Sequence, residues 1–252
     1  MRAADRRRVQ NPLGSEQPAI DFHGGLALGW EAKYSSRASF RSRDKLLAAL
    51  LHETVEVGAF WLDAGCGTGH FSRQIATLGA SVTGLDGATE MVVTAQRLGG
   101  GADGARLLYR TCSDLTCLPE QDESFDGVLC SSVLEYLEEP TRLLDEFWRV
   151  TRPGGSLIVT IPNRRALVRK AERFLLAVTS AFRHPYPRYL EHVKGEWTAR
   201  EAIALLSKAG FDVRSVAIGG LGWGPSWLDR QALWGTLLFI LATRLPEKPR
   251  AA

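Results

Sequence analysis

Cysteine is scarce in this sequence, and its few cysteines are not spaced as in a metal site. The 252-residue chain contains Cys66, Cys112, Cys117 and Cys130, and no two of them form a CxxC pair. Because a zinc site needs a second pair of ligands at a suitable spacing, we predict no metal. Scattered, unpaired cysteines are typical of a reducing compartment, so we expect a cytoplasmic protein.

An excess of charge of one sign is also lacking. The chain has 31 Lys and Arg against 28 Asp and Glu, a net charge of +3. This balance is too even to indicate a nucleic-acid partner, and we predict none. The first 18 residues are rich in Arg but have no apolar core, so they do not form a secretory signal. We predict a disordered tail over 1–18 and one domain over 19–252.

No hydrophobic run is long enough to cross a bilayer, which takes about 20 residues. The most apolar stretch is Gln231–Thr243, which carries no charge. A run of this kind is better explained as a buried central strand than as a membrane anchor.

Apolar strand patterns alternate with helical patterns along most of the chain. The predicted strands are Phe60–Ala64, Ser81–Leu85, Arg106–Thr111, Phe125–Cys130, Ser156–Ile161, Phe211–Ile218 and Leu237–Thr243. The predicted helices between them are His70–Leu78, Glu90–Leu98, Thr141–Val150 and Thr198–Ala209. This alternation predicts an α/β fold with a doubly wound, mostly parallel sheet. Because no helical pattern separates the last two strands, we expect the seventh strand to be antiparallel.

A glycine-rich turn follows the first predicted strand and reads Asp63-Ala64-Gly65-Cys66-Gly67-Thr68-Gly69. Glycines allow a tight turn and let a ligand approach the main chain. The exposed N–H groups and the positive end of the next helix favour an anionic group. A dinucleotide site would need a glycine at position 70, which is His70, so the spacing disfavours NAD. It fits the carboxylate of S-adenosylmethionine (SAM), with Asp63 near the ammonium group.

Two further carboxylates follow strands at the edge where ligands of open α/β sheets bind. Asp86 ends the second strand, where it can accept both ribose hydroxyls, and Asp114 follows the third, where it can accept the adenine amino group. The alternatives, a helix cap for Asp86 and a plain loop residue for Asp114, stay open.

The successive segments DAGCGTG, LDGATEMV, CSDLTCLPEQDESFDGVLCSSVLEYLEEP and LDEFWRVTRPGGSLIVTIPN resemble the motifs of class I SAM-dependent methyltransferases. The chain is most similar to the small-molecule O-methyltransferases of ubiquinone biosynthesis. The resemblance implies a sheet of order 3-2-1-4-5-7-6 and a cofactor-binding arginine at Arg41 or Arg43. The residues that it and the turn geometry predict at the cofactor are Asp63, Gly65, Cys66, Gly67, Gly69, Asp86, Gly87, Met91, Asp114, Leu115, Cys130 and Arg43.

The sequence indicates less clearly which residues bind the methyl acceptor. Family members often read Leu-Glu-His after the fourth strand, where this chain has Leu134-Glu135-Tyr136. The candidate catalytic residues are His192, Glu135 and Tyr136. His184 is a weaker candidate for contact with the substrate, and His23 is weaker still. We predict methyl transfer to a small molecule, on an oxygen of a quinone precursor, polyketide, lipid or sugar. A non-catalytic SAM-binding partner and an NAD-dependent oxidoreductase are the alternatives.

An insertion over 163–195 follows the fifth strand, and we expect it to form a lid over the acceptor. Its helical part, over 164–182, has apolar residues at helical spacing and a second face with Arg165, Arg169, Lys170 and Arg173. Either the apolar stripe packs on the domain, or the helix meets an anionic membrane or a lipophilic substrate. The segment Phe22 to Phe40 is expected to close the cofactor site from the other side. The oligomeric state is not predictable from these patterns.

Overall fold

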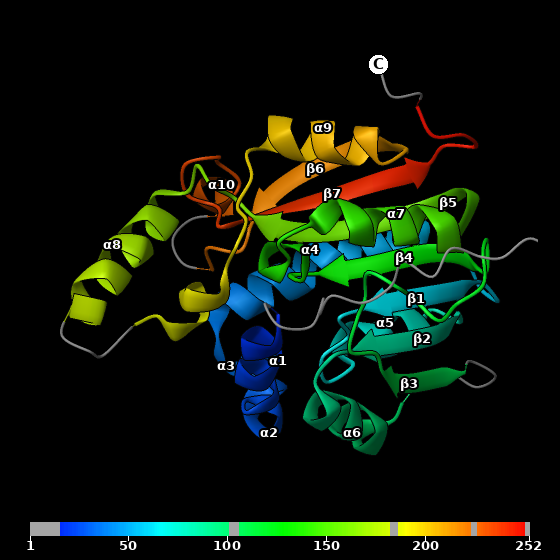
Figure 1. The fold of residues 1–252 in the computed structure, drawn as a ribbon, viewed down its shortest axis with the longest axis horizontal. Coiled ribbons are helices and arrows are strands. Elements are labelled where there is room, and N and C mark those ends of the chain that lie inside the picture. Colours follow the sequence, from blue (N-terminus) through cyan, green and yellow to red (C-terminus); the bar gives the residue numbers. More distant parts are fainter. Residues whose placement is uncertain (1–15, 101–105, 182–185, 223–225, 250–252) are drawn as a thin grey trace, which may run out of the picture.

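A single seven-stranded sheet forms the centre of the computed structural model, which describes residues 16–100, 106–181, 186–222 and 226–249. The strands lie in the order β3-β2-β1-β4-β5-β7-β6 (Figure 1). They are β1 (Phe60–Ala64), β2 (Ser81–Asp86), β3 (Leu107–Thr111), β4 (Phe125–Ser131), β5 (Thr151–Pro162), β6 (Phe211–Gly219) and β7 (Leu237–Arg244). Only β7 runs antiparallel to its neighbours β5 and β6. The predicted fold class and strand order are confirmed.

The apolar run near the C-terminus is a buried strand, as predicted. β7 lies between β5 and β6, and Phe239, Ile240 and Ala242 in it are fully buried. Within the described part of the chain, no helix has the length and apolar character needed to cross a membrane.

The start of β5 differs from the prediction, which began this strand at Ser156. β5 begins at Thr151 and passes through Pro153, Gly154 and Gly155. Its pairing with β4 shifts register there, because Phe125 pairs with Thr151 while Gly127 pairs with Ser156. Gly154, with φ of +80°, allows the extra residues to bulge without ending the strand.

Helices cover both faces of the sheet. α4 (Ala38–Thr54) and α5 (His70–Thr77) pack through Leu47, Leu51 and Ile75 on one face. α7 (Pro140–Val150) and α9 (Ala199–Lys208) pack through Phe147 and Leu206 on the other. The remaining helices are α1 (Gln17–Gly24), α2 (Ala27–Trp30), α3 (Ala32–Ser36), α6 (Thr89–Leu98), α8 (Leu167–Ala181), α10 (Ser226–Asp229) and the 3-10 helices η1 (Leu134–Tyr136) and η2 (Arg188–His192).

Local signals in the sequence fix one of these helix ends. The Thr198 side chain accepts the Glu201 N–H, and the Glu201 side chain accepts the Thr198 N–H, which together form a capping box.

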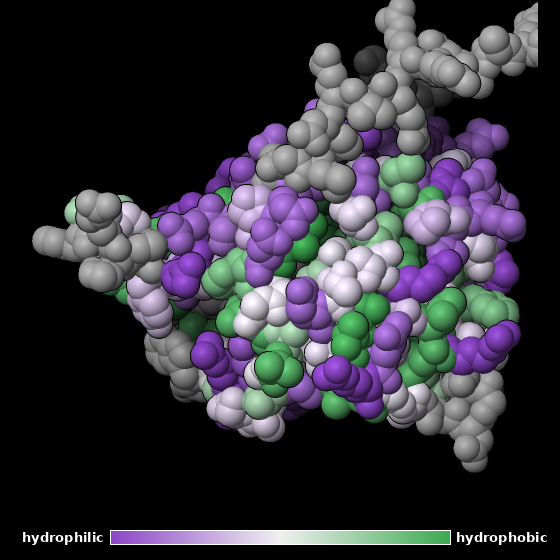
Figure 2. Space-filling model, turned by 60° about the horizontal axis from the view of Figure 1, so that its bottom comes forward, coloured by the Kyte–Doolittle hydropathy of each residue, from purple (hydrophilic) through white to green (hydrophobic). Residues whose placement is uncertain are grey.

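Three short helices precede the sheet and form what we call the N-terminal cover, residues 17–36. α1 begins at Gln17, inside the predicted tail, because Pro18 suits the first helical turn and Ala19 is buried. The rest of that tail, 1–15, lies outside the described residues. In Figure 1 the cover lies beside α6, and its helices contact α6. The face that Figure 2 brings forward carries apolar residues interspersed with polar ones.

His70 ties the cover to the helix that follows the glycine turn. Its Nδ1 lies 2.7 Å from Glu31 Oε1, and its Nε2 lies 2.7 Å from Asp44 Oδ1. The ring of Tyr34 stacks on it at 3.6 Å, and Arg73 pairs with the same Glu31 at 2.8 Å. Burial by itself would lower the pKa of His70, but the hydrogen bonds with Glu31 and Asp44 outweigh it and raise the pKa above 6.5. When protonated, His70 is thus a bridge between two carboxylates, that of Glu31 between α2 and α3 and that of Asp44 on α4.

We therefore predict that this bridge weakens as the pH rises. A histidine with a raised pKa in the folded state stabilises fully below the unfolded pKa of about 6.5 and loses its effect as the pH passes the folded pKa. At pH 6, His70→Asn is expected to lower the free energy of unfolding by about 2 kcal/mol, the scale of hydrogen bonds to charged groups. Urea unfolding from pH 6 to 9 should show this difference shrinking. His52→Asn, at an exposed position of α4, is the control. A pH-independent difference would contradict the role of His70.

Candidate functional site

One large cavity, of about 830 Å³, opens at the carboxyl ends of β1, β2 and β4. Its walls come from the turn after β1, the residues after β2 and β4, the N-terminal cover with α4, and α8 with η2. Its size is typical of a site for a small molecule or cofactor. Open α/β sheets place their ligands at this edge.

The glycine turn after β1 is held against the end of β2. The N–H groups of Gly65 and Cys66 both donate to the carbonyl of Leu85, at 2.7 and 3.0 Å. Gly65 has φ of +75°, and a Cβ there would lie 2.2 Å from Val133, so only glycine fits. At Gly67 a Cβ would meet nothing closer than 4.0 Å, which leaves the main chain open to the cavity.

Asp86 connects this turn to the start of α6. Its two carboxylate oxygens accept the N–H groups of Gly67 and Ala88, each at 2.8 Å. Burial raises the pKa of Asp86, while these two N–H groups act in the opposite direction. Since a carboxylate oxygen has about two lone pairs, each oxygen keeps one for a ligand hydroxyl. The helix-cap alternative holds only in part, because Ala88 is the cap residue of α6.

Asp63 is the second carboxylate at the glycine turn, and its side chain is only 2% exposed. It accepts a hydrogen bond from Ser72 Oγ at 2.5 Å. Burial raises its pKa to about 7, although the bond from Ser72 opposes this. A positive ligand group near Asp63 would lower its pKa again, because it would stabilise the charged carboxylate. The arrangement fits an ammonium group in the cavity.

The N-terminal cover forms the opposite wall, as expected for the segment Phe22 to Phe40. Ile20 lies over Gly87, and Trp30 packs with Met91 in one apolar cluster. The structure also decides between the two arginines in α4. Arg43 lines the cavity, and its buried Nε has no hydrogen-bond partner, whereas Arg41 donates to the carbonyl of Ser35.

Eleven of the predicted site residues come together in the cavity lining. They are Asp63, Gly65, Cys66, Gly67, Asp86, Gly87, Met91, Leu115, Arg43, Glu135 and Tyr136.

Four predicted site residues lie outside this lining. Of these, Cys130 lies in the sheet core and Gly69 lies in the glycine turn. The Cys130 side chain points into the core under β4 and is fully buried, so that prediction is wrong for its side chain. Ser131 and Ser132, the next residues, face the cavity instead. Gly69 packs on Tyr109 and takes φ of +76° to start α5, so its role is structural.

The other two lie close to the cavity without lining it. Asp114 Oδ1 accepts the N–H and hydroxyl of Thr116, the loop arrangement that was the alternative reading. His192 packs against Phe22 at 5.1 Å between ring centroids. His184 lies outside the described residues.

The acceptor side of the cavity begins after β4, where η1 presents Glu135 and Tyr136. Glu135 is 4% exposed, and its Oε2 is buried without a hydrogen-bond partner. Burial raises its pKa to about 7, against the hydrogen bond from its own N–H and the charges of Arg169 and Arg43. Burial also raises the pKa of Tyr136, so its hydroxyl stays protonated.

His23 also lines this cavity and was missed by sequence reasoning. Its ring contacts that of Tyr136 edge-on, with centroids 5.1 Å apart. The sequence offered no signal for it, because His23 lies in a short helix far from every motif. Only the packing of the N-terminal cover over the sheet edge brings it to the site.

The orientation of α8 is the opposite of the one expected if the apolar stripe of the predicted lid packed on the domain. Its one buried residue is Arg169, which forms an ion pair with Glu196 at 2.9 Å, and both side chains are under 10% exposed. The placement of Arg169 on an exposed basic face is therefore wrong. In the apolar stripe, Leu167, Phe174, Leu175 and Val178 are exposed, Phe174 to 73%, whereas Val168 lines the large cavity.

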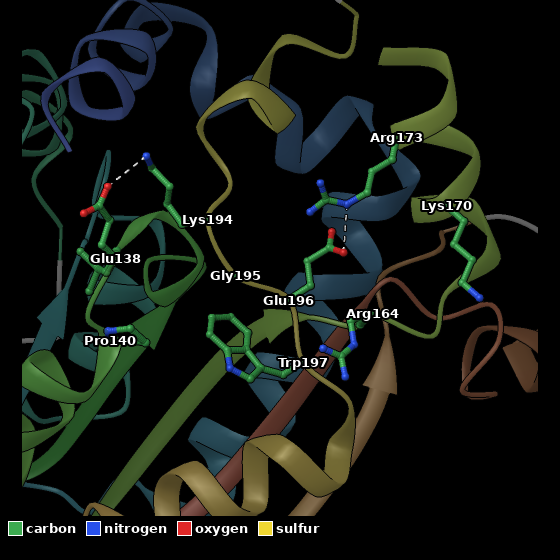
Figure 3. Close-up of a pocket in the computed structure, with 10 residues that line it drawn as sticks. Glu138, Pro140, Arg164, Lys170, Arg173, Lys194, Gly195, Glu196 and Trp197 are labelled. Carbon is green, nitrogen blue, oxygen red and sulfur yellow. Dashed lines mark hydrogen bonds and ion pairs between the residues drawn. The ribbon is translucent and has the colours of Figure 1, made fainter. Parts of the chain in front are cut away.

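A second hollow, of about 580 Å³, lies beside α8 and the segment 194–197. Figure 3 shows Lys194 reaching toward Glu138 and Arg173 reaching toward Glu196 across it, at 3.4 and 3.1 Å. Arg164 pairs with Glu201. Because these basic groups are held in ion pairs at an open surface, we place the functional site in the larger cavity.

Together, the sheet order, the antiparallel last strand and the glycine turn with Asp86 define the fold and cofactor site of a class I SAM-dependent methyltransferase. A family model described as "Methyltransferase domain" matches residues 62–159. A ubiquinone biosynthesis O-methyltransferase of Xanthomonas oryzae pv. oryzae is 35% identical over 178 residues, which cover 70% of this chain and 71% of that protein. One from Xylella fastidiosa is 28% identical over 240 residues, covering 93% and 94%.

The fold is similar to that of a magnesium protoporphyrin IX methyltransferase from Synechocystis with bound S-adenosylhomocysteine (SAH). The TM-score is 0.64 at 19% identity, covering 91% of this chain and 99% of that one. The chain thus belongs to the class I SAM-dependent methyltransferase family, with the ubiquinone biosynthesis O-methyltransferases among its relatives. This membership decides against the NAD-dependent alternative.

We predict that Asp86→Asn and Asp86→Ala weaken the binding of SAH. Both variants remove a half-buried carboxylate that has lone pairs free for ligand hydroxyls and that fixes the Gly67 N–H. Since a hydrogen bond to a charged group contributes about 1.5–3 kcal/mol, the dissociation constant should rise about 10- to 100-fold. Isothermal titration calorimetry measures it, with Asp145→Ala, an exposed partner of Lys248, as control. Unchanged affinity in both variants would refute this role of Asp86.

Proposed function

We propose that this methyltransferase acts on a hydroxyl oxygen of a small aromatic molecule, such as a phenol or catechol. The observation that carries the proposal is Glu135, a buried carboxyl with an unpartnered oxygen in the same cavity as the glycine turn and Asp86. The similarity to ubiquinone biosynthesis O-methyltransferases supports an oxygen acceptor. Quinone precursors, polyketides, lipids and sugars remain the wider set of acceptors.

The proposed division of labour follows from the two sides of the cavity. SAM, when bound, supplies a methyl group on a positively charged sulfur. The N–H groups of the glycine turn, Asp63 and Arg43 hold its amino-acid end, and Asp86 holds its ribose hydroxyls. Main-chain and side-chain groups of this kind align the reactants, which can account for most of the rate of methyl transfer.

Glu135 takes the proton of the acceptor hydroxyl. Its unpartnered Oε2 would accept the proton of the acceptor hydroxyl, and the acceptor oxygen would then take the methyl group that SAM supplies. A base whose pKa of about 7 lies near the operating pH is suited to this step. Tyr136, protonated next to Glu135, orients the acceptor. The alternative of a SAM-binding partner without catalysis has no use for such a base.

We predict that Glu135→Gln lowers kcat/KM about 100-fold and leaves the affinity for SAH unchanged. The pKa of Glu135, raised to about 7 by burial, means that the wild-type rate should rise with pH through 7 and then level off. The Glu135→Gln variant should lack this rise of the rate with pH, called the pH limb below. Transfer of a labelled methyl group from SAM to a panel of catechols, phenols and sugars measures both. Glu139→Gln, at an exposed site, is the matched control.

Absence of turnover with every acceptor would favour the non-catalytic alternative. A wild-type pH limb that persists in Glu135→Gln would assign the proton to another group.

We also propose that α8 contacts an anionic membrane surface, which would give access to lipophilic acceptors. Leu167, Phe174, Leu175 and Val178 are exposed along one side of this helix. Lys170 and Arg173 are exposed on the same helix, and Arg165 precedes it. Exposed apolar side chains flanked by basic ones are typical of helices that lie in a membrane interface. The scattered cysteine pattern of the sequence is typical of a reducing compartment, which supports a cytoplasmic location for this contact.

We predict that the protein sediments with phosphatidylglycerol vesicles and much less with phosphatidylcholine vesicles. Because apolar burial and charge both contribute to such binding, Phe174→Ser with Val178→Ser, and separately Lys170→Gln with Arg165→Gln, should each lower the bound fraction several-fold. Ile203→Ser, an exposed apolar position on α9, should leave it unchanged. Equal sedimentation of all variants, or none with the wild type, would rule out this contact.

A further inference from the structure

Unpartnered polar atoms gather in one place in the described part of the structure. Five buried side-chain nitrogen or oxygen atoms there lack a hydrogen-bond partner, and three of them, His23 Nε2, Arg43 Nε and Glu135 Oε2, belong to residues of the large cavity. Buried polar groups in proteins are nearly always hydrogen-bonded, so unpaired ones in a cavity indicate a missing ligand. Arg43 and Glu135 already have proposed roles, while His23 has none.

The ring of His23 is held in position by its aromatic neighbours. Its centroid lies 5.1 Å from that of Tyr136, 5.3 Å from that of Phe22 and 5.4 Å from that of Trp30, all in edge-on contacts. These contacts fix the imidazole by packing and use neither ring nitrogen. Nε2 is thus buried, oriented and free.

The surroundings of His23 also fix its charge. Burial lowers its pKa to about 4, and the nearby positive groups of Lys33, His192 and Arg43 act in the same direction. The ring is therefore neutral at pH 7. A neutral imidazole nitrogen either donates or accepts, depending on the tautomer, and a hydroxyl can pair with it in both cases. A carboxylate could pair only with the N–H form, and an ammonium group only with the lone-pair form.

We propose that His23 is an acceptor-binding residue, whose Nε2 forms a hydrogen bond with a hydroxyl of the methyl acceptor. The inference rests on the proposed function, in which Glu135 of the same cavity takes the proton of the reacting hydroxyl. His23 then holds a second oxygen of the acceptor. The enzyme should accordingly prefer acceptors with two neighbouring hydroxyls over those with one, because a lone hydroxyl leaves a buried nitrogen unpaired.

The first test compares two substitutions with pyrocatechol and phenol as probes. His23→Phe keeps the ring that packs on Tyr136 and Trp30 but removes both nitrogens, and His23→Gln keeps a group that can donate and accept. We expect His23→Phe to lower kcat/KM for pyrocatechol at least 10-fold and to lose most of the preference over phenol. His23→Gln should recover a large part of both. SAH affinity should stay within about twofold in each. His52→Phe, at an exposed position of α4, is the control.

A second test uses the wild-type protein and needs neither folding of a variant nor turnover. Diethylpyrocarbonate acylates neutral imidazole nitrogens, and mass spectrometry reports the modified residue. His23 should be modified in the presence of SAH and protected when pyrocatechol is added, while exposed His52 is modified equally in both samples.

The outcomes separate the two proposals. Failure of pyrocatechol to protect His23, failure of His23 to react at all, or an unchanged preference in a folded His23→Phe variant would overturn the role of His23. Protection of His23 without methyl transfer to any acceptor would leave His23 as a ligand-binding residue and would count against the proposed function.

Discussion

Two main-chain N–H groups donate hydrogen bonds to one carboxylate, that of Asp86. The geometry of the cofactor side of the molecule depends on these two bonds. The N–H of Gly67 comes from the turn after β1, and the N–H of Ala88 comes from the start of α6. Asp86 therefore fixes two neighbouring crossovers of the sheet relative to each other. The N–H groups of Gly65 and Cys66 hold the turn against β2 through the Leu85 carbonyl, and a Cβ at Gly65 would collide with Val133 on the other side. The same carboxylate serves both the loop geometry and, through its remaining lone pairs, the ligand.

The second constraint is the N-terminal cover, which converts the open sheet edge into a cavity. It is joined to the domain by the His70 bridge to Glu31 and Asp44 and by apolar contacts of Ile20 and Trp30 with α6. Because the cover carries His23 and leads into the helix that carries Arg43, its packing brings both residues to the lining of the cavity. The opposite wall carries Glu135, so the polar groups without a hydrogen-bond partner face the same cavity from both walls.

α8 shows how a buried ion pair can determine which face of a helix packs on the domain. Arg169 and Glu196 pair under the helix, where an unpaired charge would be costly, and this places the polar side of α8 toward the domain. The apolar stripe is left outside. An apolar helix face toward solvent is unusual for a chain with so large a core, and it is the physical basis for the proposed membrane contact.

The sequence by itself determined the sheet. The strands, the antiparallel β7 and the glycine turn followed from local patterns, since strand periodicity and glycine conformation act between residues close in the chain. The strand order came from the resemblance to the methyltransferase family. The ends of the elements were less certain, as the bulged start of β5 shows. The tertiary structure alone decided the remainder of the site. It buried Cys130, left Gly69, Asp114 and His192 outside the lining, selected Arg43 over Arg41 and brought in His23. For His23 and Arg43 the reason is physical: their positions depend on how the N-terminal cover and α4 pack on the sheet edge, and contacts between segments so distant in the chain leave no local pattern in the sequence.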